Sequence, residues 1–364
     1  MTTDPAGIES AELVQAAAES GHHVTLRMLE EFRAQGLIPR PARAANRGRQ
    51  PRWLHAPGTE RQLISLMQWR NQTKNPNALR VLLWLDGFPL TTSDVRTSLS
   101  SSIRTAAQIM ETERAALASR QGVEPAAAVS RIASTLASKR GAKALPRAVR
   151  MKASERSDAV ELMLRLFAFG ESIETTEEQA AAVERMLGVS PGRRQRVEGA
   201  GPWLTGPAQD LFSAAEFLSL PKLVVTTEGA SDAELEGARK LVLAIFRFLP
   251  IMARMLGALF DDDNHAGLGG MKHIDENPEF VLLLVPSVVA IIRAGQHEVL
   301  EEVVAALEPT PHLMAELQKI LEMPASEVDA NLRNLPPAKE RKMRRVIAAA
   351  VDGKIDLAPP AICD

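Results

Sequence analysis

The spacing of apolar residues predicts helices along most of the chain. In the first ninety residues, apolar positions recur at helical intervals over residues 8–19, 24–35, 59–72 and 75–85. Leu26, Leu29 and Phe32 carry the second of these patterns. Gly36 stands where a helix commonly ends, and Asn75-Pro76 has the form of an N-cap followed by the first helical residue. Ser10 is the expected N-cap of the first helix, and Thr59-Glu60-Arg61-Gln62 has the form of a capping box for the third.

Residues 40–56 interrupt this pattern. They have no helical period and contain several Pro and Gly residues, and Trp53-Leu54 is placed to close a small hairpin. We expect Phe32 and Trp53 to lie in the core, fastening this hairpin to the preceding helix.

The remainder of the chain is also predicted to be helical. Residues 94–121 and 125–140 form a connector with few large apolar residues, and the composition becomes strongly apolar after residues 145–155. Leu223–Thr227 (LVVTT) is the best strand candidate beyond the hairpin. The expected helices of the C-terminal region span 155–170, 176–187, 207–219, 231–260, 278–294, 296–307, 311–322, 325–333 and 338–352.

Composition narrows the class of protein. The chain has 364 residues and one cysteine, Cys363, so it forms no intrachain disulfide and fits a reducing compartment. Its first ten residues are acidic and lack an apolar signal core. The apolar runs Leu241–Phe260 and Val281–Ile292 contain Arg or Pro, so we interpret both as buried helices rather than membrane spans. The expected location is the cytoplasm, without membrane attachment.

Positive charge is concentrated near the N-terminus. Between His22 and Arg70 there are nine arginines and three glutamates, a net charge of +6, whereas the whole chain carries −2. Arginine forms forked hydrogen bonds with phosphates and with guanine edges. This local charge therefore indicates binding to nucleic acid, and a solvated basic surface on an ordinary helical domain is the alternative.

These features together resemble the MerR class of winged helix-turn-helix regulators, and among them the divergent actinobacterial and phage-like members. The resemblance covers residues 8–90: a short helix, a turn, a helix ending in Gly36-Leu37-Ile38-Pro39, an Arg-rich segment, an aromatic residue, and a new helix after Pro57-Gly58-Thr59.

The resemblance implies a fold and a set of DNA-binding residues. Residues 24–34 would be the recognition helix, with Thr25, Arg27, Met28 and Glu31 near bases or phosphates. The wing would contain Arg43, Arg47, Arg49 and Arg52, and we add Arg40 to the DNA-binding set because it precedes the wing directly. Family members usually bind pseudo-palindromic double-stranded DNA as dimers, often joined by a helix in the position of 94–121.

The chain also departs from the family pattern. The usual aromatic pair of the recognition helix is replaced by Glu31-Phe32, the wing aromatic is Trp53, and no effector-binding cysteines follow. The fold we predict is mostly α: a winged helix-turn-helix domain (8–90), a helical connector with a basic end (91–152), and an all-helical dimerisation or sensing domain (153–358).

Other candidate chemistry is weaker. Asp261-Asp262-Asp263-Asn264-His265 contains metal-binding residue types, but its spacing does not fit an EF-hand, and we interpret it as an acidic loop. The sequence shows no nucleophile–base pair, nucleotide-binding loop or zinc-protease motif, so we predict neither an enzyme nor a cofactor or metal site. Lys339–Arg345 (KERKMRR) is a second basic run, more typical of a solvated helix face.

Three functions fit the sequence. The first is a dimeric, sequence-specific transcriptional regulator that answers to a small-molecule or protein effector. The second is a phage or mobile-element factor, such as a lysogeny switch or a recombination directionality factor, which an adjacent integrase gene would favour. The third is a ligand- or partner-binding module that has lost DNA binding. The apolar helices 241–260 and 278–294, which carry several Met and Phe residues, suit a ligand pocket, but a core or a dimer interface is the commoner explanation and the sequence does not separate these.

Overall fold

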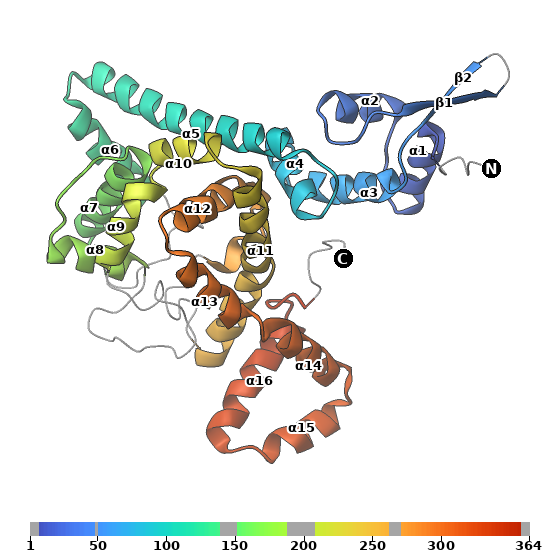
Figure 1. Ribbon diagram of the computed structural model, residues 1–364. Helices are drawn as coiled ribbons and strands as arrows, with labels where there is room; N and C mark the ends of the chain where they lie inside the picture. Colours follow the sequence, from blue (N-terminus) through green and yellow to red (C-terminus); the bar gives the residue numbers. More distant parts are fainter. Residues whose placement is uncertain (1–6, 48–49, 139–150, 188–207, 262–270, 358–364) are drawn as a thin grey trace. The chain divides into compact units, whose positions relative to one another are not determined.

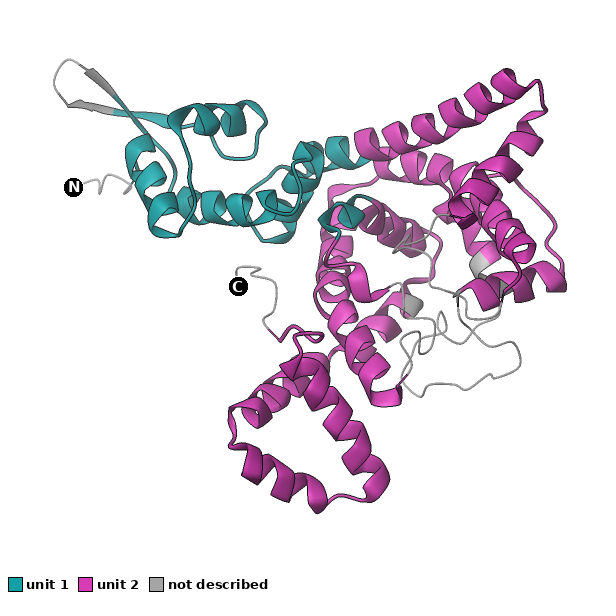
Figure 2. Ribbon diagram, turned by 180° about the vertical axis from the view of Figure 1, so that it is seen from behind, with its two compact units in different colours: residues 1–99, 277–282, 361–364 teal, residues 100–276, 283–360 magenta. Residues whose placement is uncertain are grey.

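The computed structural model is mostly helical, as predicted, with one two-stranded sheet among the residues that it describes (Figure 1). These residues are 7–47, 50–138, 151–187, 208–261 and 271–357, without the side chains of 45–47, 50–51, 208–211 and 299. The chain separates into two compact units (Figure 2). Unit 1 comprises residues 1–99, 277–282 and 361–364, and unit 2 comprises residues 100–276 and 283–360.

Unit 1 contains the N-terminal helices and the hairpin. Its elements are α1 (Ser10–Glu19), α2 (Leu26–Ala34), β1 (Ala42–Arg47), β2 (Gln50–Leu54), α3 (Thr59–Arg70), α4 (Pro76–Leu85), the start of α5 (Thr92–Gln121) and the 3-10 turn η4 (Pro278–Phe280). The predicted connector, 91–152, is shared between the units because α5 continues from one into the other. The domain borders 8–90, 91–152 and 153–358 remain predictions.

The core of unit 1 is built mainly from leucine. The largest fully buried side chains of the described residues, apart from Phe246, belong to this unit, and include Trp84, Phe32 and a run of leucines in α1 to α5. Asn75 caps α4 as predicted, accepting hydrogen bonds from the backbone N–H groups of Asn77 and Ala78. After α4, the buried Asp86 carboxylate accepts hydrogen bonds from Ser65 Oγ (2.5 Å) and Trp69 Nε1 (2.7 Å), which fastens α3 to α4.

Unit 2 contains the remaining helices. They are the rest of α5, α6 (Pro125–Ser138), α7 (Ala153–Met163), the π-helix η1 (Leu164–Ala168), α8 (Glu177–Leu187), α9 (Ala208–Leu218), α10 (Leu220–Glu228), α11 (Asp232–Phe260), α12 (Val281–Arg293), α13 (His297–Leu307), α14 (Thr310–Glu322), α15 (Ala325–Arg333) and α16 (Pro337–Val351). The first two residues of α12 belong to unit 1.

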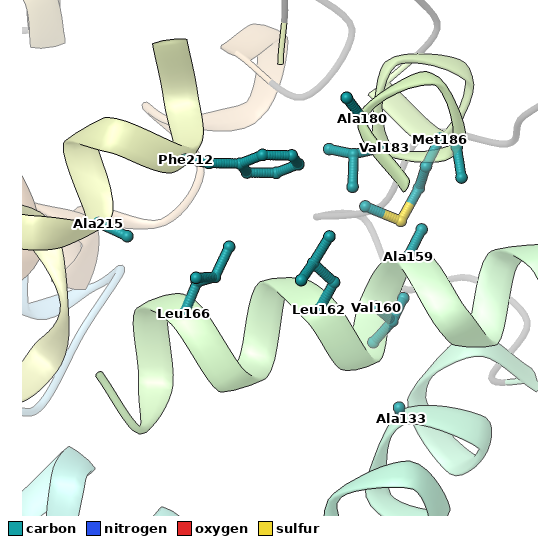
Figure 3. Packing of buried hydrophobic residues seen from close by; sticks show 11 residues of the cluster. Ala133, Ala159, Val160, Leu162, Leu166, Ala180, Val183, Met186, Phe212 and Ala215 are labelled. Carbon is teal, nitrogen blue, oxygen red and sulfur yellow. The ribbon is translucent and has the colours of Figure 1, made fainter. Parts of the chain in front are cut away.

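One apolar cluster joins α6, α7, η1, α8 and α9. Figure 3 shows Phe212 of α9 pointing toward Val183 of α8, beside Leu162 and Leu166. In η1 the backbone N–H of Phe169 donates to the carbonyl of Leu164, five residues earlier, which is the hydrogen-bond pattern of a π-helix. The cluster is therefore lined by a helix that carries one irregular turn.

A second part of unit 2 is organised around α11, which packs against α13, α14 and α16. Ser231 and Glu234 form a capping box at its start. The same Glu234 carboxylate receives two hydrogen bonds from Arg293 at the end of α12, at 2.5 and 2.9 Å, and these hydrogen bonds, more than any other cause, lower the pKa of Glu234 to about 2. By length and composition α11 is also the one described helix able to cross a membrane, a property shared with core helices of soluble proteins.

Several local predictions are corrected by the structure. Leu223–Thr227 lies in α10 rather than in a strand: Pro221 falls in its first turn, and the Thr227 hydroxyl donates to the carbonyl of Leu223 (2.6 Å) within the helix. Glu9, not Ser10, is the residue before α1, and it forms the capping box with Glu12. No capping box opens α3, because Gly58 precedes it in a left-handed conformation and the Thr59 hydroxyl donates to the carbonyl of Ala56 (2.7 Å).

Candidate nucleic-acid interface

The helix α2 presents a mixed charge to solvent. Thr25 is its N-cap, and its hydroxyl accepts the backbone N–H of Met28 (3.2 Å). Arg27 is almost fully exposed and pairs with exposed Glu31 (3.2 Å), one turn later on the same face. Of the four residues expected near DNA on this helix, Arg27 and Glu31 face solvent, Thr25 caps the helix, and Met28 is half-buried.

The strands β1 and β2 pair antiparallel, as the hairpin prediction requires. Arg43 lies opposite Trp53, Ala44 opposite Arg52, and Arg47 opposite Gln50, with an irregularity in register after Ala44. Directly opposed residues place their side chains on the same face of a hairpin. Arg43 and Trp53 are both exposed, so they form one outward face, which we call the Arg43–Trp53 face. The side chain of Arg47 and the whole of Arg49 lie outside the described residues.

Trp53 is therefore not the core residue that we predicted. Its side chain is 52% exposed, whereas Phe32 is buried as expected. The buried polar residue at the end of β2 is His55 instead, two positions after Trp53.

A buried polar junction ties the hairpin to the helices. The Arg33 guanidinium donates to Ser10 Oγ (2.7 Å) on α1 and lies 2.6 Å from His55 Nε2, and it also pairs with Glu30 (2.5 Å). Desolvation by burial lowers the pKa of His55, and the neighbouring positive charge of Arg33 lowers it further. Both effects favour the neutral imidazole, whose Nε2 accepts from Arg33, because a guanidinium has only donors. We call this cluster the Arg33–His55 junction.

Two further contacts hold the hairpin at the same end. Ile8 and His55 exchange both backbone hydrogen bonds, at 2.8 and 3.1 Å, which adds a short bridge beside β2. Arg52 Nε donates to Glu9 Oε1 (2.6 Å) on the residue before α1. The end of the hairpin nearest α1 is fixed, while the Arg43–Trp53 face is left to solvent.

The nine arginines between His22 and Arg70 are consequently not equivalent. Arg33 and Arg52 are engaged within the fold, and Arg70 lies over the Phe32 ring, 5.1 Å from its centroid. The arginines that the structure places in solvent are Arg27, Arg40, Arg43 and Arg61. Sequence reasoning missed the junction because its members are 22 and 45 residues apart and meet only through the hairpin.

The other sequence candidates give no comparable site. Asp261 ends α11 in a left-handed conformation, and the rest of the acidic segment, Asp262 to His265, lies outside the described residues. No group of three or more His, Cys, Asp or Glu side chains within the described ranges is arranged to hold a metal ion.

Comparisons of the chain with protein-family models, with curated proteins and with solved structures return no match. The proposal for its function therefore rests on the residues and contacts described above.

Proposed function

We propose that residues 8–90 are a winged helix-turn-helix DNA-binding domain of the MerR type, and that the protein is a sequence-specific transcriptional regulator. The order of elements supports this proposal: two short helices joined by a turn, an antiparallel hairpin, and two further helices before the long α5. In such a domain the second helix reads base edges in the major groove and the hairpin contacts phosphates.

The observation that carries the proposal is the division of the hairpin into a fixed end and a free cationic face. The Arg33–His55 junction and the Arg52–Glu9 pair set its position against α1 and α2. Arg43 is exposed opposite the exposed Trp53, and Arg40, two residues before β1, is exposed as well. Exposed arginines on a hairpin whose base is fixed suit the recognition of a phosphate backbone, because the arginine side chains rather than the hairpin backbone then lose freedom on binding.

The remaining parts of the proposal concern assembly and control. The helix α5 has 30 residues and carries Ile109 with a 57% exposed side chain, which supports a helix available for pairing with a second copy of the chain. A dimer would bind two half-sites of a pseudo-palindromic duplex. The helices of unit 2 would dimerise further or sense a small-molecule or protein effector.

Selection of bound sequences from random duplex DNA, using the full chain, tests this function. The expected result is an enriched motif with a fixed half-site spacing. In a binding titration against that motif, the variant Arg40→Ala/Arg43→Ala should weaken the affinity about tenfold or more. The slope of log affinity against log salt concentration should become shallower by about two, because two phosphate contacts are lost. The matched control is Arg120→Ala/Arg131→Ala, which removes two exposed arginines of α5 and α6.

No enrichment of any sequence, or equal affinities for the two double variants, would contradict the proposal. Enrichment of single half-sites without a fixed spacing would contradict the dimer alone.

A further inference from the structure

The end of α15, the turn that follows it and the first half of α16 carry a concentration of positive charge. From Arg333 to Arg345 there are six cations and one acid, a net charge of +5 in a chain whose overall charge is −2. The six cations are Arg333, Lys339, Arg341, Lys342, Arg344 and Arg345. This net charge is close to the +6 of the N-terminal basic region, but it is carried by a much shorter segment.

Only the second half of α16 contributes buried apolar side chains to the core. Val346 and Ala349 are buried in a cluster with Ile251 of α11 and with Met314 and Leu317 of α14. Arg341, Arg344 and Arg345, spaced three and four residues apart, lie on one side of the helix, and all three are exposed. Lys339 and Lys342 are exposed on other sides of its first turns, and Arg333 is exposed at the end of α15. We call the exposed surface that these six cations form the α16 cationic face; Figure 1 shows α15 and α16 joined by their short turn.

Acidic neighbours neutralise only part of this face. Arg344 pairs with Asp329 of α15 (2.6 Å) and with Glu340 (3.0 Å), and Arg345 lies 3.5 Å from Asp261. Lys342 lies over the Phe260 ring, 4.8 Å from its centroid. Within the described residues, Arg333, Lys339 and Arg341 are exposed and have no carboxylate at salt-bridge distance. A surplus of positive charge therefore remains in solvent.

This surplus opposes the stability of the helix itself. Like charges one turn apart, such as Arg341 and Arg345, repel each other. Cations in the first turns of a helix, such as Lys339, also meet the positive end of the helix dipole. Since neither effect helps α16 to fold, the arrangement is better suited to a partner that supplies negative charge.

The composition of the face favours duplex DNA as that partner. Four of its six cations are arginines, which form two-pronged hydrogen bonds with phosphate oxygens. From Lys339 to Arg345 the helix advances about 9 Å, a length over which a duplex strand presents two or three phosphates. A helix that lies in a membrane surface would instead carry a row of large apolar side chains beside the cations. On α16, Val346 and Ala349 are buried, and the exposed large apolar side chain, Val351, lies beyond the cations at the end of the helix.

We propose that the α16 cationic face is a second DNA-contact surface, which binds the phosphate backbone without reading the sequence. It extends the DNA-binding function proposed for residues 8–90 but does not depend on the same residues, so each proposal can fail without the other.

A binding titration with the full chain and a 30-bp duplex of arbitrary sequence, between about 50 and 200 mM salt, tests this surface. The variant Lys339→Glu/Arg341→Glu should weaken the apparent Kd by about tenfold to a hundredfold and reduce the salt slope by about two. The matched control is Arg131→Glu/Lys222→Glu, which makes the same change of charge at exposed positions of α6 and α10. Far-UV circular dichroism of both variants checks that they remain folded.

The outcomes separate the two proposals. If the α16 variant and the control bind the duplex equally, the second surface is overturned, whatever happens at the N-terminal domain. The second surface is also overturned if the α16 variant loses binding to vesicles of anionic lipid while its binding to DNA is unchanged. If the α16 variant alone loses DNA binding while the parent chain selects no sequence, the second surface stands and the sequence-specific function of residues 8–90 fails.

Discussion

Arg33 shows how the surroundings of one residue change its role. In sequence it is one of nine arginines in a basic segment, yet its guanidinium is only 11% exposed and is used to hold Ser10, Glu30 and His55. An arginine in this position contributes little to the attraction of a phosphate. Its structural importance lies in holding the hairpin in place, and its charge adds to the effect of burial in lowering the pKa of His55.

We predict that unit 1 loses stability as the pH falls below the ordinary His55 pKa of 6.5. The folded-state pKa of His55 is lowered, so below pH 6.5 the unfolded chain binds a proton that the folded chain resists. At pH 5.5 the loss reaches at most about 1.4 kcal/mol, the value for a histidine that stays neutral when folded. Urea unfolding at pH 7.5 and 5.5 measures it.

The variant His55→Gln provides the comparison, because its side-chain oxygen still accepts from Arg33 but does not titrate. Its free energy of unfolding should change less between the two pH values than that of the parent chain. An identical change in both proteins would show that His55 does not control this pH dependence.

Asp86 is a second residue whose role comes from burial. Asp86→Ala removes the acceptor of the Ser65 and Trp69 hydrogen bonds and leaves two buried donors without it. We expect a loss of about 2–4 kcal/mol in the free energy of unfolding of unit 1. Asp86→Asn keeps one acceptor oxygen and should lose less. Equal stabilities of the two variants in urea unfolding would contradict this explanation of the buried carboxylate.

At the scale of elements, glycines illustrate how position determines the effect of one methyl group. Gly36 ends α2 with φ of +67°, a left-handed conformation that alanine adopts with strain, whereas Gly237 lies inside α11 with no atom near an added Cβ. Gly36→Ala should destabilise the protein by about 1 kcal/mol. Gly237→Ala should stabilise it by about 0.5–1 kcal/mol. Thermal unfolding of both variants should shift in opposite directions, and shifts of the same sign would contradict the prediction.

The helices themselves were largely predictable from the sequence, because apolar period and end signals agree with each other. The bounds of α13, α14 and α15 fall within a residue or so of the predicted ranges. The exception, α10, has a β-branched sequence (LVVTT) whose local preference favours a strand. Its tertiary contacts override that preference: Leu223 is buried with Ile103 of α5 and Ala290 of α12.

The hairpin was predictable as an element, but the direction of its side chains was not. Trp53 is exposed although His55, two residues later, is buried, so the alternation along the strand alone does not decide which side chains meet the helices. In the same way, the pairing of Arg52 with Glu9 depends on the approach of two segments 43 residues apart. Leu26, which follows the helical apolar pattern, is 59% exposed because it begins α2 at the edge of the unit. These features follow from tertiary structure rather than from local pattern.

At the scale of the whole molecule, the two units should respond to acid at different pH values. Unit 1 weakens below pH 6.5 through His55, whereas the Glu234–Arg293 pair of unit 2 contributes fully above the ordinary Glu pKa of 4.5 and is lost only as the pH falls toward about 2. Three of the four tryptophans belong to unit 1. In an acid titration, tryptophan emission should therefore change at a higher pH than the helical signal at 222 nm.

Coincident transitions for the two signals would contradict this independence. Glu234→Gln provides the internal check, since it should alter the helical transition at low pH and leave the tryptophan transition in place.

The π-helix η1 has a consequence for how the length of this chain can vary. Its Leu164–Phe169 hydrogen bond closes over one residue more than an α-helical turn, so the segment accommodates an extra residue without interrupting the helix. Deletion of a single residue there would leave a regular α-helix. It would also rotate the preceding helix α7 relative to Glu171, whose carboxylate pairs with Arg114 and Arg165. Related chains that differ from this one by a single-residue gap should therefore carry that gap at this turn, together with a changed partner for Arg114.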